Sequence, residues 1–176
     1  MILNNYWKYL AAVEDSRNNI ATDTIRYPGI KNTSGTTFGV TTGSQYFSSR
    51  VDQMNHNLIV RSNTFIRVGT GNTEVTAEDY NLANDITASL SNVQNSQTIT
   101  TDEEGKLITT YTLSATNNTA NAITLKEVGI YKSSIWGATN DTGLTNNCFF
   151  ARKLLDTPLE VPVGTSFTMT FNWSEG

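Results

Sequence analysis

The chain is poor in the residues that carry most enzyme chemistry. It has one cysteine, one histidine and three prolines among 176 residues, and charged residues make up only 16%. A single cysteine excludes an intrachain disulfide, so the fold must be held together by its core. A single histidine excludes metal sites that need two histidines, including the HExxH helix.

Basic residues are scattered, and the formal net charge is -4. Nucleic-acid binding requires clustered lysine and arginine to displace counterions, and the closest cluster here is Arg152 and Lys153. We therefore expect no nucleic-acid partner. No apolar run approaches the length of a membrane span, so we expect no membrane insertion. The apolar run within Met1–Tyr6 is too short for a signal peptide, which predicts synthesis in the cytoplasm.

Threonine, serine and asparagine are abundant, whereas charged residues are few. Threonine suits a pleated sheet, whereas asparagine and serine favour turns. The segment Ser166–Trp173 alternates large apolar residues with small polar ones, which places Phe167, Met169, Phe171 and Trp173 on one face of a strand. This pattern predicts a strand with one face on a core and the other in water.

Related patterns along the chain define the other expected strands. They fall at 36–40, 58–60, 65–68, 86–90, 97–101, 106–115, 123–132, 148–155 and 158–161. Turn-rich connections of roughly 3–15 residues, without long helices between them, are typical of antiparallel packing. We predict an all-β fold, an antiparallel β-sandwich of the jelly-roll or immunoglobulin-like kind, with a short N-terminal helix and arm.

Two segments interrupt this pattern. Thr76 followed by Asp79 resembles a helix start, with room for only a turn or two of helix. The segment 133–147 is rich in glycine, asparagine and threonine, and we expect a flexible loop there. Its Trp136 is a candidate ligand contact, because an exposed ring can stack on a sugar; it can also fold back onto the domain edge or meet a neighbouring subunit.

The N-terminal residues 5–16 have the periodicity of a short helix. Tyr6, Leu10 and Val13 fall at helical spacing, and Trp7 lies beside them. A helix of this length is marginal alone and must dock on another surface. That surface is either its own domain or a neighbouring subunit, in which case these four residues form an assembly anchor.

The following segment, residues 18–50, is poor in large apolar residues. It is either a loosely structured extension or part of the core. We predict a helix and extended arm over residues 1–50 and a sandwich domain over residues 51–176.

No catalytic arrangement emerges from the remaining candidates. Cys148 lies in an apolar run, and we interpret it as a small core residue rather than a nucleophile paired with His56. Gly69 and Gly71 lack the further residues of nucleotide-binding loops and indicate a turn that ends a strand. The acidic clusters lack the spacing of a calcium loop. We predict a protein without enzyme activity, bound metal or cofactor.

Several pieces of the stretch 67–173 occur in an order and spacing that resemble small virion proteins of tailed bacteriophages. They are Val68–Gly71, Thr76–Leu82, Ile123–Tyr131, Phe150–Leu155 and Val161–Gly164, followed by the final strand. The resemblance implies a β-sandwich structural component of the head, collar or tail, located in the virion, and it implies no catalytic residues. Homo-oligomers and contacts with other virion proteins are the expected interactions. The alternative is a carbohydrate-binding or host-recognition module, with a host surface glycan as partner.

Overall fold

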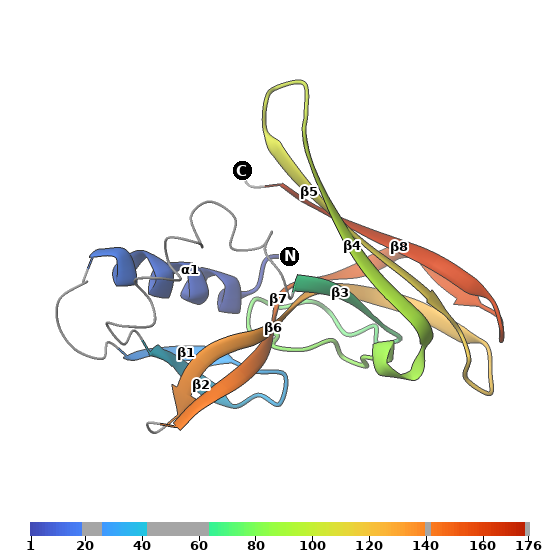
Figure 1. The fold of residues 1–176 in the computed structure, drawn as a ribbon. Coiled ribbons are helices and arrows are strands. Elements are labelled where there is room, and N and C mark those ends of the chain that lie inside the picture. The colour runs from blue at the N-terminus through green and yellow to red at the C-terminus, as the bar shows by residue number, and fades with distance from the viewer. Residues whose placement is uncertain (19–25, 42–63, 140–141, 175–176) are drawn as a thin grey trace. The chain divides into compact units, whose positions relative to one another are not determined.

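The computed structural model describes residues 1–18, 26–41, 64–139 and 142–174. These residues form an all-β protein with one N-terminal helix, which confirms the predicted fold class. In chain order the elements are α1 (Asn4–Asn18), β1 (Arg26–Lys31), β2 (Thr37–Thr41), β3 (Thr64–Gly69), the 3₁₀ helix η1 (Thr87–Ser89), β4 (Ser91–Thr101), β5 (Leu107–Thr116), β6 (Ile123–Thr139), β7 (Thr142–Val161) and β8 (Ser166–Ser174) (Figure 1).

The strands of the described residues form two sheets. The larger sheet has the order β1-β2-β6-β3, with β7 also paired to β6, and the smaller sheet has the order β4-β5-β8. The chain divides into two compact units. Unit 1 comprises Met1–Thr64, Thr76–Asn81 and Lys132–Ala151, and unit 2 comprises Phe65–Val75, Leu82–Tyr131 and Arg152–Gly176.

Unit 2 is a two-layered β-sandwich. One layer is the sheet β4-β5-β8, and the other contains β3 with the parts of β6 and β7 that belong to this unit (Figure 1). Strands β5 and β8 pair antiparallel without interruption, from Ile108 opposite Ser174 to Thr116 opposite Ser166. Both layers contribute buried apolar side chains, which are Ile66, Val68, Leu125, Ile130, Val161, Tyr111, Leu113, Ala115 and Trp173.

The final strand has the predicted alternation, but its apolar face is less buried than that of its neighbour. In β5 the inward residues from Thr109 to Ala115 are buried. In β8 only Trp173 is buried, whereas Phe167, Met169 and Phe171 are half-buried. Strand β8 lies at the edge of its sheet, where a side chain has a neighbouring strand on one side only.

The opposite face of this sheet explains why the chain is rich in small polar residues. Hydroxyl and amide side chains meet across β5 and β8: the Thr110 hydroxyl donates to the Asn172 side-chain oxygen over 3.0 Å, and the Ser114 and Thr168 hydroxyl oxygens lie 3.1 Å apart. Cross-strand pairs of this kind each stabilise a sheet by roughly 0.2–1 kcal/mol. The face is therefore neutral, polar and internally hydrogen-bonded.

Asn117 fixes the two connections that lead from one layer of unit 2 to the other. Its side-chain amide donates to the carbonyl oxygens of Asn121 and Val161 over 3.0 and 2.9 Å. Its backbone N–H donates to the Thr165 carbonyl, and its carbonyl accepts from the Gly164 N–H. Asn117 is fully buried, so this asparagine is a structural element of the sandwich.

The expected helix start at Thr76 was wrong. The Thr76 hydroxyl does donate to the Asp79 carboxylate over 2.8 Å, as at a helix start, but the chain continues as a turn. The backbone N–H groups of Ala83 and Asn84, which a continuing helix would use, donate to the Glu127 carboxylate instead. The capping pattern therefore formed without the helix it usually precedes.

The expected strand at 86–90 was also wrong. The segment forms η1, because Asp85 accepts the backbone N–H of Thr87 over 2.9 Å and the Thr87 hydroxyl donates to the Val68 carbonyl over 3.2 Å. These bonds turn the chain at η1, which lies beside the end of β3. The preference of threonine for strands is too weak to oppose them.

The expected loop at 133–147 was wrong as well. Strand β6 continues to Thr139 and β7 begins at Thr142, so the segments 148–155 and 158–161 belong to one long strand. Serine, threonine, isoleucine and tryptophan all tolerate a strand, and the glycines of this segment lower that tendency without abolishing it. Trp136 therefore belongs to a strand, and its side chain lies outside the described residues.

Within the segment 18–50, the described residues 26–41 contain two strands, of which the sequence predicted only the second. Strand β1 pairs antiparallel with β2, and its register shifts between Tyr27 and Ile30. Gly29 has a φ of +124°, so Pro28 and Gly29 mark a bulge within the strand. The predicted strand at 58–60 and the residue His56 lie outside the described residues.

Candidate functional site

Unit 2 contains a buried ion pair between Glu127 on β6 and Arg152 on β7. The Arg152 Nε donates to Glu127 Oε2 over 2.8 Å, and the two side chains are 2% and 0% exposed. Three backbone N–H groups complete the carboxylate's bonding: those of Gly71 and Asn84 donate to Oε1 over 3.1 and 2.8 Å, and that of Ala83 donates to Oε2 over 3.0 Å. Both carboxylate oxygens are therefore fully engaged.

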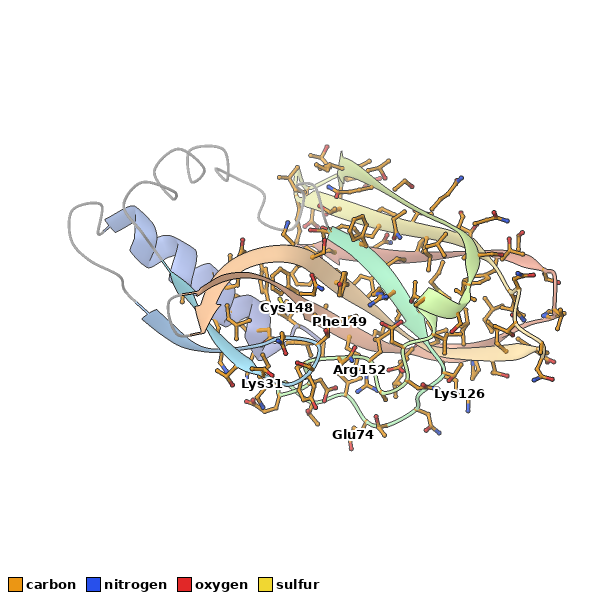
Figure 2. The ribbon with its side chains drawn as sticks, turned by 60° about the horizontal axis from the view of Figure 1, so that its bottom comes forward. Lys31, Glu74, Lys126, Cys148, Phe149 and Arg152 are labelled. Carbon is orange, nitrogen blue, oxygen red and sulfur yellow. The ribbon has the colours of Figure 1, made fainter. Side chains whose placement is uncertain are left out.

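The arginine holds the opposite side of the same loop region. Its Nη2 donates to the carbonyl oxygen and the hydroxyl of Thr73 over 3.0 and 3.1 Å, and its Nη1 lies 3.5 Å from the Glu74 carbonyl oxygen. Figure 2 shows Arg152 on its strand and Glu74 on the neighbouring loop. Removing two charges from water is costly, and only complete hydrogen bonding of this kind offsets the cost.

Gly69 and Gly71, at and just after the end of β3, leave room for the Glu127 carboxylate. A Cβ atom at Gly69 would overlap the Glu127 carboxylate and the Asn84 carbonyl oxygen. A Cβ atom at Gly71 would overlap the same carboxylate and the Ala83 side chain. The sequence predicted only a turn that ends a strand, and the reason for both glycines is the close approach of the backbone to a buried anion.

The ion pair brings together residues from several of the sequence pieces named above. Val68–Gly71 supplies one backbone donor, Ile123–Tyr131 supplies Glu127, and Phe150–Leu155 supplies Arg152. The other two donors, Ala83 and Asn84, directly follow the piece Thr76–Leu82. A carboxylate with this many donors and no exposed surface fixes backbone positions, and it has no lone pair left for proton transfer.

The sequence offered one signal for this pair that the prediction did not use. Glu127 occupies the inward-facing position between Leu125 and Gly129, and Arg152 follows the buried run Cys148–Ala151. Two opposite charges, each at an inward-facing position among apolar neighbours, indicate that the two charges meet.

Helix α1 docks within unit 1. The rings of Tyr6 and Tyr9 lie 5.8 and 5.2 Å from the Phe150 ring, measured between centroids. The buried side-chain amide of Asn5 donates to the Lys31 carbonyl over 2.8 Å and accepts the Lys31 backbone N–H over 2.9 Å. The sequence left two docking surfaces open for this helix, its own domain or a neighbouring subunit. The structure shows that the helix docks on its own chain.

The four residues considered as an assembly anchor have different environments. Tyr6 is buried, Leu10 is half-buried, and Trp7 is 54% exposed. The side chain of Val13 lies outside the described residues. Among the three whose side chains are described, Trp7 has the large exposed apolar surface, so it remains a candidate for contact with another protein.

Cys148 is fully buried in unit 1, as expected for a core residue. Burial raises the pKa of its thiol well above the ordinary value, and the nearby Lys132 ammonium offsets only part of this shift. Because the thiolate is the reactive form, we expect the native protein to resist a thiol reagent at pH 8, and the guanidinium-unfolded protein to react completely. Rapid stoichiometric labelling of native protein would contradict this placement.

A groove of about 400 Å³ opens in unit 2 beside β3. Phe65, Arg67, Val93, Asn95 and Tyr131 contribute to its lining. The Arg67 guanidinium carbon lies 4.7 Å from the centroid of the Tyr131 ring, and an Arg67 nitrogen lies 3.0 Å from the Asp85 carboxylate. In this groove the Arg67 guanidinium lies over the Tyr131 ring and is also paired with Asp85, which fixes the positions of both side chains.

Within the ranges that the structure describes, no three histidine, cysteine, aspartate or glutamate residues gather as metal ligands. None of the helices described there is long and apolar enough to cross a membrane. Comparisons with protein-family models, with curated proteins and with solved structures found no match to the chain.

Proposed function

We propose that the chain is a non-enzymatic structural component of a tailed-bacteriophage virion, in its head, collar or tail, that acts through repeated protein–protein contacts. The observation that carries the proposal is the buried ion pair of Glu127 and Arg152. Glu127, Arg152 and the donor Gly71 come from three of the five pieces of the phage-like sequence pattern, and every part of the network holds backbone in place. Residues that fix backbone positions favour a structural role for the chain over a catalytic one.

The surface of the chain also suits repeated contacts. The hydroxyl-rich face of the sheet β4-β5-β8 is uncharged and polar. On α1, Trp7 offers a large apolar contact surface. Exposed tryptophan is enriched at protein interfaces, because it buries much apolar area and loses little rotamer entropy. We propose Trp7 as the residue through which α1 contacts another virion protein or another copy of the chain.

Complementation of a phage that lacks this chain tests the role of Trp7. The Trp7→Ala variant is expected to enter particles at less than about a tenth of the wild-type copy number, because truncation of an interface tryptophan commonly costs 2 kcal/mol or more. Val163→Ala is the matched control, since Val163 is also 54% exposed. Equal incorporation of both variants and the wild type would overturn the anchoring role.

The second candidate function is recognition of a host surface glycan. The groove beside Arg67 and Tyr131 supports it, because an aromatic face and a cation are common features of sites for polar ligands. A glycan array probed with wild type, Tyr131→Ala and Trp136→Ala separates the two possible contacts. Loss of binding in one variant would locate the site, and no binding by the wild type would eliminate this candidate.

A further inference from the structure

Strand β8 presents an outer edge that pairs with no strand among the described residues. Its inner edge is fully paired with β5 over nine residues, Ser166–Ser174. The strand contains no charged residue and no proline, and its register with β5 shows no shift. Natural proteins use such charges, prolines and bulges to prevent edge-to-edge pairing. Strand β8 has none of these safeguards.

The other edge of the same sheet differs in this respect. The register of β4 with β5 shifts between Ser91 and Gln94, and Asn92 has a φ of +50°. An irregularity of this kind bends an edge strand away from a partner. The row of β4 that contains Asn95 and Gln97 is also more polar than the apolar row of β8. The open edge suited to pairing is therefore that of β8.

The residue pattern of β8 matches itself about a two-fold axis at Thr170. Antiparallel pairing of two copies about this axis would place Phe167 opposite Trp173 and Met169 opposite Phe171. The polar residues would then face one another on the other side of the sheet. No pair would bring like charges together, and all nine residues would take part. The half-buried side chains of Phe167, Met169 and Phe171 would each gain a neighbour.

We propose that two copies of this chain associate through antiparallel pairing of their β8 strands about a two-fold axis at Thr170. The two sheets then become one continuous sheet, and backbone N–H and C=O groups along this edge of β8 bond to those of the second copy. The inference builds on the proposed structural function and names a second copy of the chain as a partner.

Charge variants at Thr170 test this dimer. Because Thr170 would face its own copy across the axis, Thr170→Lys and Thr170→Glu each place two like charges side by side. Light scattering is expected to show a dimer for the wild type and a monomer for each variant, with dimerisation weakened roughly tenfold or more. An equimolar mixture of the two variants is expected to form a heterodimer, which shows that neither variant is simply misfolded.

Ser96→Lys is the matched control. Ser96 pairs with Thr112, which pairs with Thr170, so Ser96 occupies the same row and face at the opposite edge of the sheet. This variant is expected to dimerise like the wild type. A monomeric wild type at high concentration, or a mixture that stays monomeric, would overturn the β8 dimer. Neither result bears on the presence of the chain in virions, so a failure here and a failure of the proposed function are distinguishable.

Discussion

Glu127→Ala is expected to lower the free energy of unfolding by about 4 kcal/mol, the largest effect of any single truncation that we propose. The substitution leaves the buried guanidinium of Arg152 without its counter-ion, and it removes the acceptor of three backbone N–H groups. Each of those N–H groups then remains a buried donor without an acceptor, and its desolvation is unfavourable. Urea unfolding of wild type and variant, monitored by tryptophan fluorescence, measures the difference.

Two controls make this prediction specific. Lys153→Ala removes the neighbouring ion pair with Asp156, whose side chains are 53% and 88% exposed, and it is expected to change stability by less than about 0.5 kcal/mol. The double variant Glu127→Leu, Arg152→Met removes both buried charges and is expected to be more stable than Glu127→Ala. If Glu127→Ala costs no more than Lys153→Ala, the ion pair does not hold the loop.

Gly69→Ala is expected to destabilise the protein by about 3 kcal/mol. The added methyl group would overlap both the Glu127 carboxylate and the Asn84 carbonyl oxygen. Backbone and a bonded carboxylate form these contacts, and neither can move aside as the end of a flexible side chain can. Thermal unfolding followed by circular dichroism reports the expected loss, together with weakened packing around β3.

Gly105→Ala separates this steric effect from the ordinary cost of replacing glycine. Gly105 has a φ of +81°, and a Cβ atom there would have no neighbour within 4 Å. Its replacement is expected to cost about 1 kcal/mol, from backbone conformation alone. A Gly69→Ala variant as stable as Gly105→Ala would show that the backbone does not closely approach the buried carboxylate.

Local residue patterns were sufficient to predict the strands in which burial alternates. Strand β5 was predicted to within a residue, and β8 was predicted by its alternation, because successive side chains meet different environments. The same patterns overestimated how deeply β8 is buried. Alternation shows which residues share a face, whereas the depth of burial depends on the strands beside it.

The failures have a common physical cause, which is that distant partners decide local structure. Thr76 and Asp79 form the hydrogen bonds of a helix start, yet the donors that would continue the helix bind Glu127, more than forty residues away in sequence. Gly69 and Gly71 are likewise required by the close approach of that carboxylate to the backbone. No short window of sequence contains these contacts, so periodicity and capping rules could not reveal them.

The candidate sites were predicted less completely than the fold. Trp7 was identified by its position on α1, and the structure shows it exposed. Tyr9 and Asn5 also contribute to the docking of the helix, and the sequence prediction included neither. Tyr9 lies three residues after Tyr6 on the same helix face, and Asn5 is a polar residue that an apolar stripe does not reveal. The expected exposure of Trp136 rested on a loop, and the backbone there is a strand.

Quantitative mass spectrometry of purified particles tests the proposed virion function most directly. Phage particles from a lysate that contains this chain would be separated from the other lysate proteins on a density gradient, and the copy number would be measured against the major capsid protein. We expect the chain to co-purify at a fixed number of several copies per particle, as repeated contacts on a symmetric assembly require. Its presence in the lysate but absence from intact particles would contradict the proposed function.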